Sequence, residues 1–328
     1  MKKRIIAVLV LALAIVIADR FILALTEKPS VGHFRSAEGR STYVTAYQDA
    51  LAAFPPEQST RVPTSFGDAY LHTWNTAATG IPILLVPGRA SGAPMWNELL
   101  PHLGTNRPVF AVDAIGDAGL STQSTPLTSM QDQAAWLAEA ISHLGLDEVH
   151  VVGHSFGGAT AAALAMYHPD LVASLTLLEP VFVLRNLPAS AFFWATVAST
   201  PLPQSWVDRA LAEIGGTTVE EIRERTPVSV MIDAASKAYS AALPTPKVLT
   251  DSELERLSMP VYIGIADHKS LAGGAKAAER AQSHLPESTV KVWPNTTHSL
   301  PFQVTEKLGN ELQEFWRASE SSAEQLRR

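Results

Sequence analysis

The sequence predicts an α/β fold, in which helices flank a mostly parallel central sheet and a helical cap is inserted between two of the strands. Short, wholly apolar runs such as 81–86 alternate with longer stretches of helical spacing, as expected when strands buried on both faces alternate with helices. This alternation stops over 181–259, where recurring prolines break the chain into short helical pieces. We therefore expect 61–180 and 260–328 to form the core and 181–259 to form the cap.

The composition is that of a globular protein, and it excludes several classes of function. With 328 residues, 46% of them hydrophobic and 17% charged, the chain can hold one large α/β domain and an insertion. A formal net charge of −7, with no Lys/Arg cluster beyond residue 4, argues against a nucleic-acid partner. The absence of cysteine excludes disulfides and thiolate metal sites.

The N-terminus has the pattern of a targeting segment. Lys2, Lys3 and Arg4 precede the uncharged run 5–18, and apolar residues return at 21–25. A basic start and an apolar core of this length are typical of a secretory signal, whereas an uncleaved segment would form a membrane tether through 5–25. We expect 1–25 to be a signal peptide or N-terminal anchor, and the protein to be extracytoplasmic, secreted or anchored to the membrane. The alternative is a buried helix of the domain.

Two further segments precede the parallel strands. Residues 26–60 are polar and mixed, with apolar spacing for a short helix only at 43–54, so we expect a stalk or N-terminal extension. Residues 61–74, centred on the turn 66–68, predict an antiparallel hairpin at the edge of the sheet.

The core elements follow in the order of a parallel α/β sheet. We expect strands at 81–86, 109–113, 149–152, 174–179, 261–265 and 288–293. We expect the helices that accompany them at 95–103, 130–144, 159–166 and 303–316.

The strand at 149–152 ends in Gly153-His154-Ser155-Phe156-Gly157-Gly158 and leads into an alanine-rich helix. Glycine at 153 and 157 permits a sharp, strained turn that exposes the hydroxyl of Ser155. The N–H of Phe156, at the start of the helix, is then free to face an anion. The pattern predicts a nucleophile elbow, and the alternative is a plain turn between a buried strand and a buried helix.

With this motif, residues 60–318 resemble the α/β-hydrolase superfamily. The resemblance implies a nucleophile, an acid and a histidine in that chain order. Ser155 matches the nucleophile, and His298 matches the base, because it follows the last strand in an Asn-Thr-Thr-His loop. Serine at the elbow argues against a haloalkane dehalogenase or an epoxide hydrolase, which use a carboxylate there.

Two residues compete for the acid. Asp267 follows the strand 261–265 in a Gly-x-x-Asp pattern similar to the family's, and it is the preferred assignment. Glu179 ends the earlier strand, where some members of the family place their acid, and it remains the alternative. Asp113 and Asp117 are also close to a strand end, but their glycine neighbours favour a structural turn.

The resemblance also implies an oxyanion hole made of two main-chain N–H groups, from Phe156 and from the loop after 81–86. In that loop Pro87 replaces the family's histidine, while Gly88 is kept, so Arg89 is the candidate for the second N–H. The turn from Asp113 to Ser121 is one residue longer than the family's. We expect His154, next to the nucleophile, to pack rather than react.

The expected function is that of an exported serine hydrolase, which cleaves a small, apolar carboxylic ester through Ser155, His298 and Asp267 with an acyl-enzyme intermediate. The same triad would support C–C bond hydrolysis or perhydrolysis, and a catalytically silent binding module of the same fold is the alternative of another class. Aromatic residues of the cap either line an apolar pocket or pack the cap onto the core: Phe192, Phe193, Trp194 and Trp206. No metal, nucleotide or other cofactor motif occurs.

Overall fold

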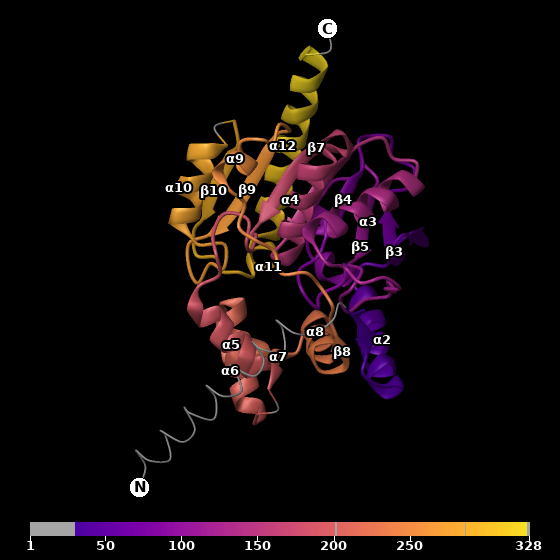
Figure 1. Cartoon of the computed structure of the whole chain (residues 1–328), viewed down its shortest axis with the longest axis vertical. Coiled ribbons are helices and arrows are strands. Elements are labelled where there is room, and N and C mark those ends of the chain that lie inside the picture. Colours follow the sequence, from indigo (N-terminus) through magenta and orange to yellow (C-terminus); the bar gives the residue numbers. More distant parts are fainter. Residues whose placement is uncertain (1–29, 201, 286, 327–328) are drawn as a thin grey trace. The chain divides into compact units, whose positions relative to one another are not determined.

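The computed structural model describes residues 30–200, 202–285 and 287–326 (Figure 1). The predicted signal peptide or anchor, 1–25, lies outside the described residues. Among those that are described, no helix is both long and apolar enough to cross a membrane.

An eight-stranded sheet forms the centre of the fold, with the order β10-β9-β7-β6-β4-β5-β3-β2. The strands are β2 (Gln58–Thr64), β3 (Gly67–Trp74), β4 (Ile83–Val86), β5 (Val109–Asp113), β6 (Val149–His154), β7 (Val172–Leu178), β9 (Val261–Ala266) and β10 (Thr289–Trp293). Strands β4, β5, β6, β7, β9 and β10 pair in parallel, while β2 and β3 form an antiparallel hairpin at one edge. The predicted α/β fold, with its edge hairpin, is confirmed.

Helices cover both faces of this sheet, which explains why its strands read as wholly apolar runs. Along β4, Leu84 and Val86 face a cluster formed with α3 (Met130–His143), α4 (Phe156–Tyr167) and α10 (Ala275–His284). Ile83 and Leu85 face a second cluster, formed with α12 (Thr305–Leu326) and two 3₁₀ turns, η1 (Ala93–Trp96) and η2 (Leu100–His102). Another 3₁₀ turn, η3 (Pro169–Leu171), precedes β7, and α11 (Leu300–Gln303) precedes α12.

The structure differs from the prediction of a helix at 95–103. Two separate 3₁₀ turns, η1 and η2, occupy this stretch. Pro94 and Pro101 each lie at the start of a turn, and a proline has no N–H to continue the ladder of a longer helix. The loop after β4 is therefore compact and irregular, and it stays close to the end of the strand.

The segment expected to be a stalk is instead part of the compact unit that begins at Val31. Helix α2 (Ala37–Leu51) is capped by Ser36 and packs against α8 (Pro227–Ala238), and β1 (His33–Phe34) pairs with β8 (Tyr239–Ser240). Tyr43 and Tyr47 of α2 are fully buried. The sequence pattern was weak because the buried face of α2 consists of tyrosine and alanine rather than strongly apolar side chains.

The inserted segment after β7 is helical, as predicted. It contains α5 (Ala189–Ser199), α6 (Gln204–Gly215), α7 (Val219–Glu224) and α8, followed by the short α9 (Asp251–Leu254). In Figure 1 the helices α5 to α8 lie below the sheet, on the same side as α2. The cap thus includes a contribution from the N-terminal part of the chain, because α2 packs on α8.

Candidate active site

Ser155 lies in a strained turn between β6 and α4. Its backbone has φ 54° and ψ −120°, a conformation that a residue other than glycine rarely adopts. Glycine is needed on both sides. A Cβ on Gly153 would collide with the main-chain oxygen of Gly157, and a Cβ on Gly157 would collide with those of Val86 and Pro87. The predicted elbow therefore has the close strand–helix approach that its sequence indicated.

Three side chains form a chain of hydrogen bonds at this turn. The Oγ of Ser155 lies 2.9 Å from Nε2 of His298, and Nδ1 of His298 lies 3.1 Å from Oε2 of Glu179. An ionised carboxylate only accepts, so Nδ1 of His298 carries the proton and Nε2 is left to accept from the serine hydroxyl. His298 is buried, and Glu179 is fully buried.

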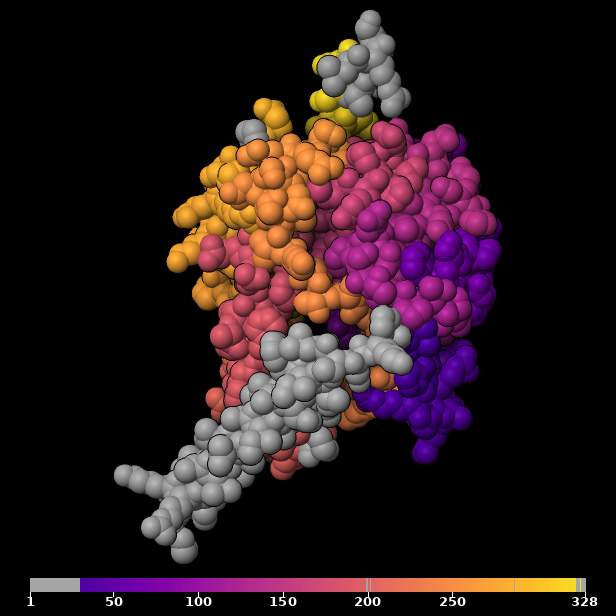
Figure 2. All heavy atoms as spheres, in the orientation of Figure 1, coloured from indigo at the N-terminus to yellow at the C-terminus, as the bar shows by residue number. Residues whose placement is uncertain are grey.

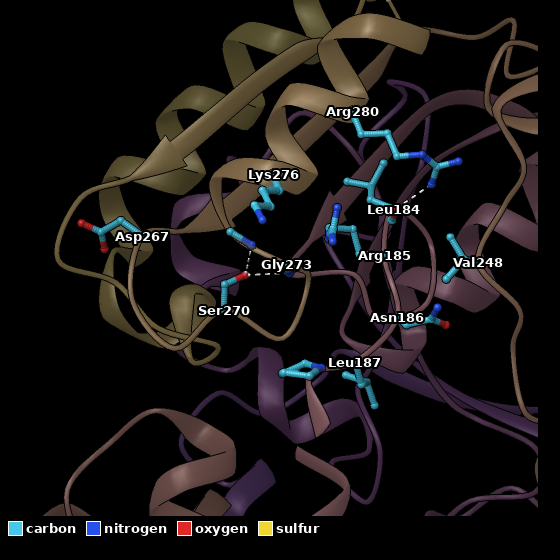
Figure 3. Close-up of a pocket in the computed structure, with 12 residues that line it drawn as sticks. Leu184, Arg185, Asn186, Leu187, Val248, Asp267, Ser270, Gly273, Lys276 and Arg280 are labelled. Atoms are coloured by element: carbon cyan, nitrogen blue, oxygen red, sulfur yellow. Dashed lines mark hydrogen bonds between the residues drawn. The ribbon is translucent and has the colours of Figure 1, made fainter. Parts of the chain in front are cut away.

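The preferred assignment of Asp267 is wrong in this geometry, since the carboxylate on His298 belongs to Glu179. Asp267 is exposed, and its oxygens accept the N–H groups of Asn295 (2.9 Å) and Thr296 (3.0 Å) as well as a bond from His268 (2.7 Å). Figure 3 shows its carboxylate pointing away from Ser270 and Gly273. Asp267 therefore orders the loop that carries His298 and does not contact the imidazole.

Glu179 lies in a cradle of donors. Oε1 accepts from the N–H of Ala266 (2.8 Å) and the hydroxyl of Ser270 (2.7 Å), and Oε2 accepts from the N–H of Leu271 (2.9 Å). Burial by itself raises the pKa of Glu179, but hydrogen bonds and charge from His298, together with these donors, bring it below its usual value. The loop after β9 thus turns main-chain N–H groups toward Glu179. The sequence had predicted that this loop supplies the acid itself, as Asp267.

His154 packs beside the base, in agreement with its predicted role. Its Nε2 donates to the main-chain oxygen of His298 at 2.9 Å, and the two rings lie 5.0 Å apart. Burial is the main cause that lowers the pKa of His154 to about 3, and the neighbouring His298 lowers it further. A neutral His154 therefore supports the backbone of His298.

The loop 88–91 lies against the elbow. A Cβ on Gly88 would be 3.3 Å from the Cβ of Ser155, a tight contact that shows how closely the loop approaches the elbow. Three of its N–H groups have acceptors: that of Gly88 bonds Sδ of Met95, that of Ala90 bonds Asp117, and that of Ser91 bonds the Gly88 oxygen. Within the described residues, the N–H of Arg89 has no acceptor, which is what an oxyanion donor requires.

Phe156 supplies the other candidate N–H, at the first position of α4, where a helix has no internal acceptor for its donors. The Arg89 guanidinium lies over the Phe156 ring, 5.9 Å from its centroid, and 3.3 Å from Asp117. The two predicted oxyanion residues are thus neighbours, and their catalytic roles remain predictions.

The cap contacts the loop of the base. The hydroxyls of Thr297 and Ser299, on either side of His298, donate to the main-chain oxygen of Gly215 at the end of α6 (3.0 and 2.9 Å). The cap therefore covers the side of the site that carries the base.

Two of the cap aromatics are exposed. Phe192 and Trp206 are 53% and 57% exposed, on α5 and α6, which form part of the outer surface in Figure 2. A pocket of about 780 Å³ is lined in part by Ser270, whose hydroxyl donates to Glu179 (Figure 3). It is lined by residues 184–188, by Val248 and by residues between 267 and 280, and Ser155 and His298 are not among them.

Comparisons with known proteins identify relatives of the chain and of its fold. Residues 81–220 match the family described as alpha/beta hydrolase fold. The chain is 22% identical over 281 residues to the uncharacterized carboxylesterase nap of Bacillus subtilis, a match that covers 84% of this chain and 92% of that protein. It is 23% identical over 286 residues to the carboxylesterase YbfK of the same organism, covering 86% and 96%. The crystal structure of naproxen esterase from B. subtilis superposes with a TM-score of 0.78 at 20% identity, covering 86% and 99%.

The chain has the α/β-hydrolase fold, and residues 81–220 match that family. Its site residues keep the α/β-hydrolase chain order, because Ser155, Glu179 and His298 follow one another along the sequence. The carboxylate that contacts His298 follows β7, the strand directly beside β6, whereas the acid was expected one strand further out, after β9.

Proposed function

We propose that this α/β-hydrolase is an exported serine esterase that cleaves small, apolar carboxylic esters. The observation that carries the proposal is the hydrogen-bonded series Ser155–His298–Glu179, because a serine hydroxyl needs a base within reach and the base needs an orienting acid. The similarity to carboxylesterases over most of the chain supports an ester as the substrate.

In the proposed reaction, Oγ of Ser155 attacks the ester carbonyl carbon while Nε2 of His298 takes the hydroxyl proton. The carbonyl oxygen becomes an oxyanion, which accepts hydrogen bonds from the N–H groups of Phe156 and Arg89. The intermediate collapses, the C–O bond to the alcohol breaks, and His298 gives its proton to the leaving oxygen. Water then attacks the acyl-enzyme by the same route and releases the carboxylic acid.

The environment of Glu179 supports this role. The donors around it keep its pKa below the usual value, so it carries a negative charge when His298 takes a proton. That charge lies 3.1 Å from the imidazole and stabilises the imidazolium.

Export is proposed on the sequence alone. Lys2, Lys3 and Arg4 followed by the apolar run 5–18 are typical of a secretory signal or an anchor. Fractionation of cells that express the full chain tests this proposal. Recovery of the intact chain, Met1 included, from the cytoplasm would contradict it.

Labelling with a fluorophosphonate probe, together with turnover on a panel of esters and diketones, tests the reaction. We expect the wild-type chain to react with the probe and to hydrolyse esters, and Ser155→Ala to lose turnover by on the order of a millionfold while it stays folded. Faster turnover of diketones than of esters would favour C–C bond hydrolysis. A folded wild-type chain that neither reacts with the probe nor turns over any substrate would favour a binding module.

A further inference from the structure

Two departures from the α/β-hydrolase pattern lie against each other in the structure. The loop after β4 has Pro87 where the family pattern has a histidine, and the turn after β5 is one residue longer than in that pattern. Asp117, within this longer turn, reaches the loop. Its Oδ2 accepts from the N–H of Ala90 at 2.8 Å and lies 3.3 Å from Nε of Arg89.

We propose that Asp117 is a positioning residue that holds the N–H of Arg89 toward the oxyanion. This inference rests on the proposed function, in which that N–H stabilises the tetrahedral intermediate. It assigns to Asp117 a specific task, where the sequence indicated only turn chemistry.

Contacts on both sides along the chain fix the main-chain N–H of Arg89. On its N-terminal side, Gly88 packs against Ser155 and His154. On its C-terminal side, the peptide between Arg89 and Ala90 is held because its N–H bonds Asp117. Ala90 has φ +58°, a left-handed conformation that alanine rarely adopts, so the loop needs such a contact to keep this shape.

The carboxylate itself is also held in place. Its side chain is 7% exposed, and Oδ1 accepts the N–H of Ala118 at 2.8 Å. A bare negative charge close to a developing oxyanion would oppose the reaction. The Arg89 guanidinium beside Oδ2 offsets that charge, which leaves Asp117 to act through the loop geometry.

The test compares Asp117→Ala, Asp117→Asn and the control Asp68→Ala, whose side chain is exposed on the β2–β3 hairpin. Loss of an oxyanion donor costs about 100- to 1000-fold in kcat, so a misplaced donor should cost on the order of 10- to 100-fold. We expect Asp117→Ala to show this loss in kcat with little change in KM. Asp117→Asn keeps one acceptor oxygen and should recover part of the loss, and Asp68→Ala should match wild type.

Two further readouts separate positioning from a general structural role. Affinity for a trifluoromethyl ketone, which forms a tetrahedral oxyanion on the serine, should fall in Asp117→Ala by the same factor as kcat/KM. The rate of fluorophosphonate labelling should fall in parallel, while Tm stays within a few degrees of the wild-type value.

A folded Asp117→Ala chain with wild-type kcat and ketone affinity overturns the inference. So does a loss of activity that is matched by a collapse of Tm, or a change confined to KM. Failure of the proposed function has a different signature, since Ser155→Ala would then retain turnover or the wild-type chain would not react with the probe.

Discussion

Glu179 combines burial, a negative charge and backbone strain at the end of β7. Its φ is 48°, in the left-handed region, and its carboxylate accepts bonds from the loop after β9 and from His298. Strain of this kind persists where surrounding contacts determine the conformation, and it is frequent at active sites. The position of the carboxylate is therefore fixed before any substrate arrives.

The comparison of Glu179→Gln with Asp267→Asn tests which acid serves His298. Glutamine cannot stabilise the imidazolium and can present its NH₂ to Nδ1, so we expect kcat to fall by roughly ten-thousandfold, as for the acid of a serine protease. Asp267→Asn should have a far smaller effect, because Asp267 bonds main-chain N–H groups of an exposed loop. Both variants are assayed on one ester at equal folded concentration, and the reverse ranking would restore Asp267.

At the residue scale, the sequence was sufficient where backbone geometry determines residue type. Glycine at 153 and 157 is required by contact with main-chain oxygens, and the position of Ser155 follows from them. Backbone geometry does not determine which residue is the acid. Both candidates end a strand at the same edge of the sheet, and only the orientation of the loop 266–271, set by tertiary contacts, distinguishes them.

At the scale of elements, the structure differs most from the sequence prediction at α2, which is a packed helix rather than part of a stalk. Its four buried residues, Tyr43, Ala46, Tyr47 and Ala50, lie at helical spacing. The hydroxyl of Tyr47 contacts His72 (2.8 Å) and donates to Asp113 (3.1 Å), whose carboxylate in turn accepts the N–H of Ala93. The N-terminal helix is thereby connected to the loop that carries Arg89, a connection between distant segments that no local pattern encodes.

We expect Tyr43→Ala to lower the free energy of unfolding by about 3 kcal/mol or more, because it removes a fully buried aromatic side chain from the contact of α2 with α8. The control Gln48→Ala, on the exposed side of α2, should change it by no more than about 0.5 kcal/mol. Denaturant unfolding of the full chain measures both. Equal stability of the two variants would mean that α2 behaves as the stalk predicted from sequence.

At the scale of the whole molecule, buried titratable groups make stability depend on pH. Burial is the main cause that lowers the pKa of His72 and His150 to about 4 and that of His154 to about 3. The unfolded chain binds their protons below about pH 6.5, so stability falls as pH decreases through this range. Asp113 acts in the opposite direction, since burial raises its pKa to about 6 and the folded state then binds its proton first.

We therefore expect a net loss of stability between pH 6.5 and 4, of about 1.4 kcal/mol per pH unit for each net proton that the unfolded chain binds. Because the pKa of Glu179 is lowered, this residue adds to the loss of stability only when the pH falls below the usual pKa of a carboxyl group. Denaturant unfolding at several pH values measures the slope, and His72→Gln should reduce it by nearly one proton. A slope that is flat from pH 7 to 4, or unchanged in His72→Gln, would contradict the buried neutral histidines.

The cap of this hydrolase is attached to the catalytic machinery at two points. Its segment begins at Val181, two residues after the acid, and the last residue of α6 accepts hydrogen bonds from both neighbours of the base. A swing of α6 away from the core has to break those bonds and disturb the loop of His298. Helix α6 and the hydrogen-bonded series Ser155–His298–Glu179 therefore share one structural support, the loop 297–299.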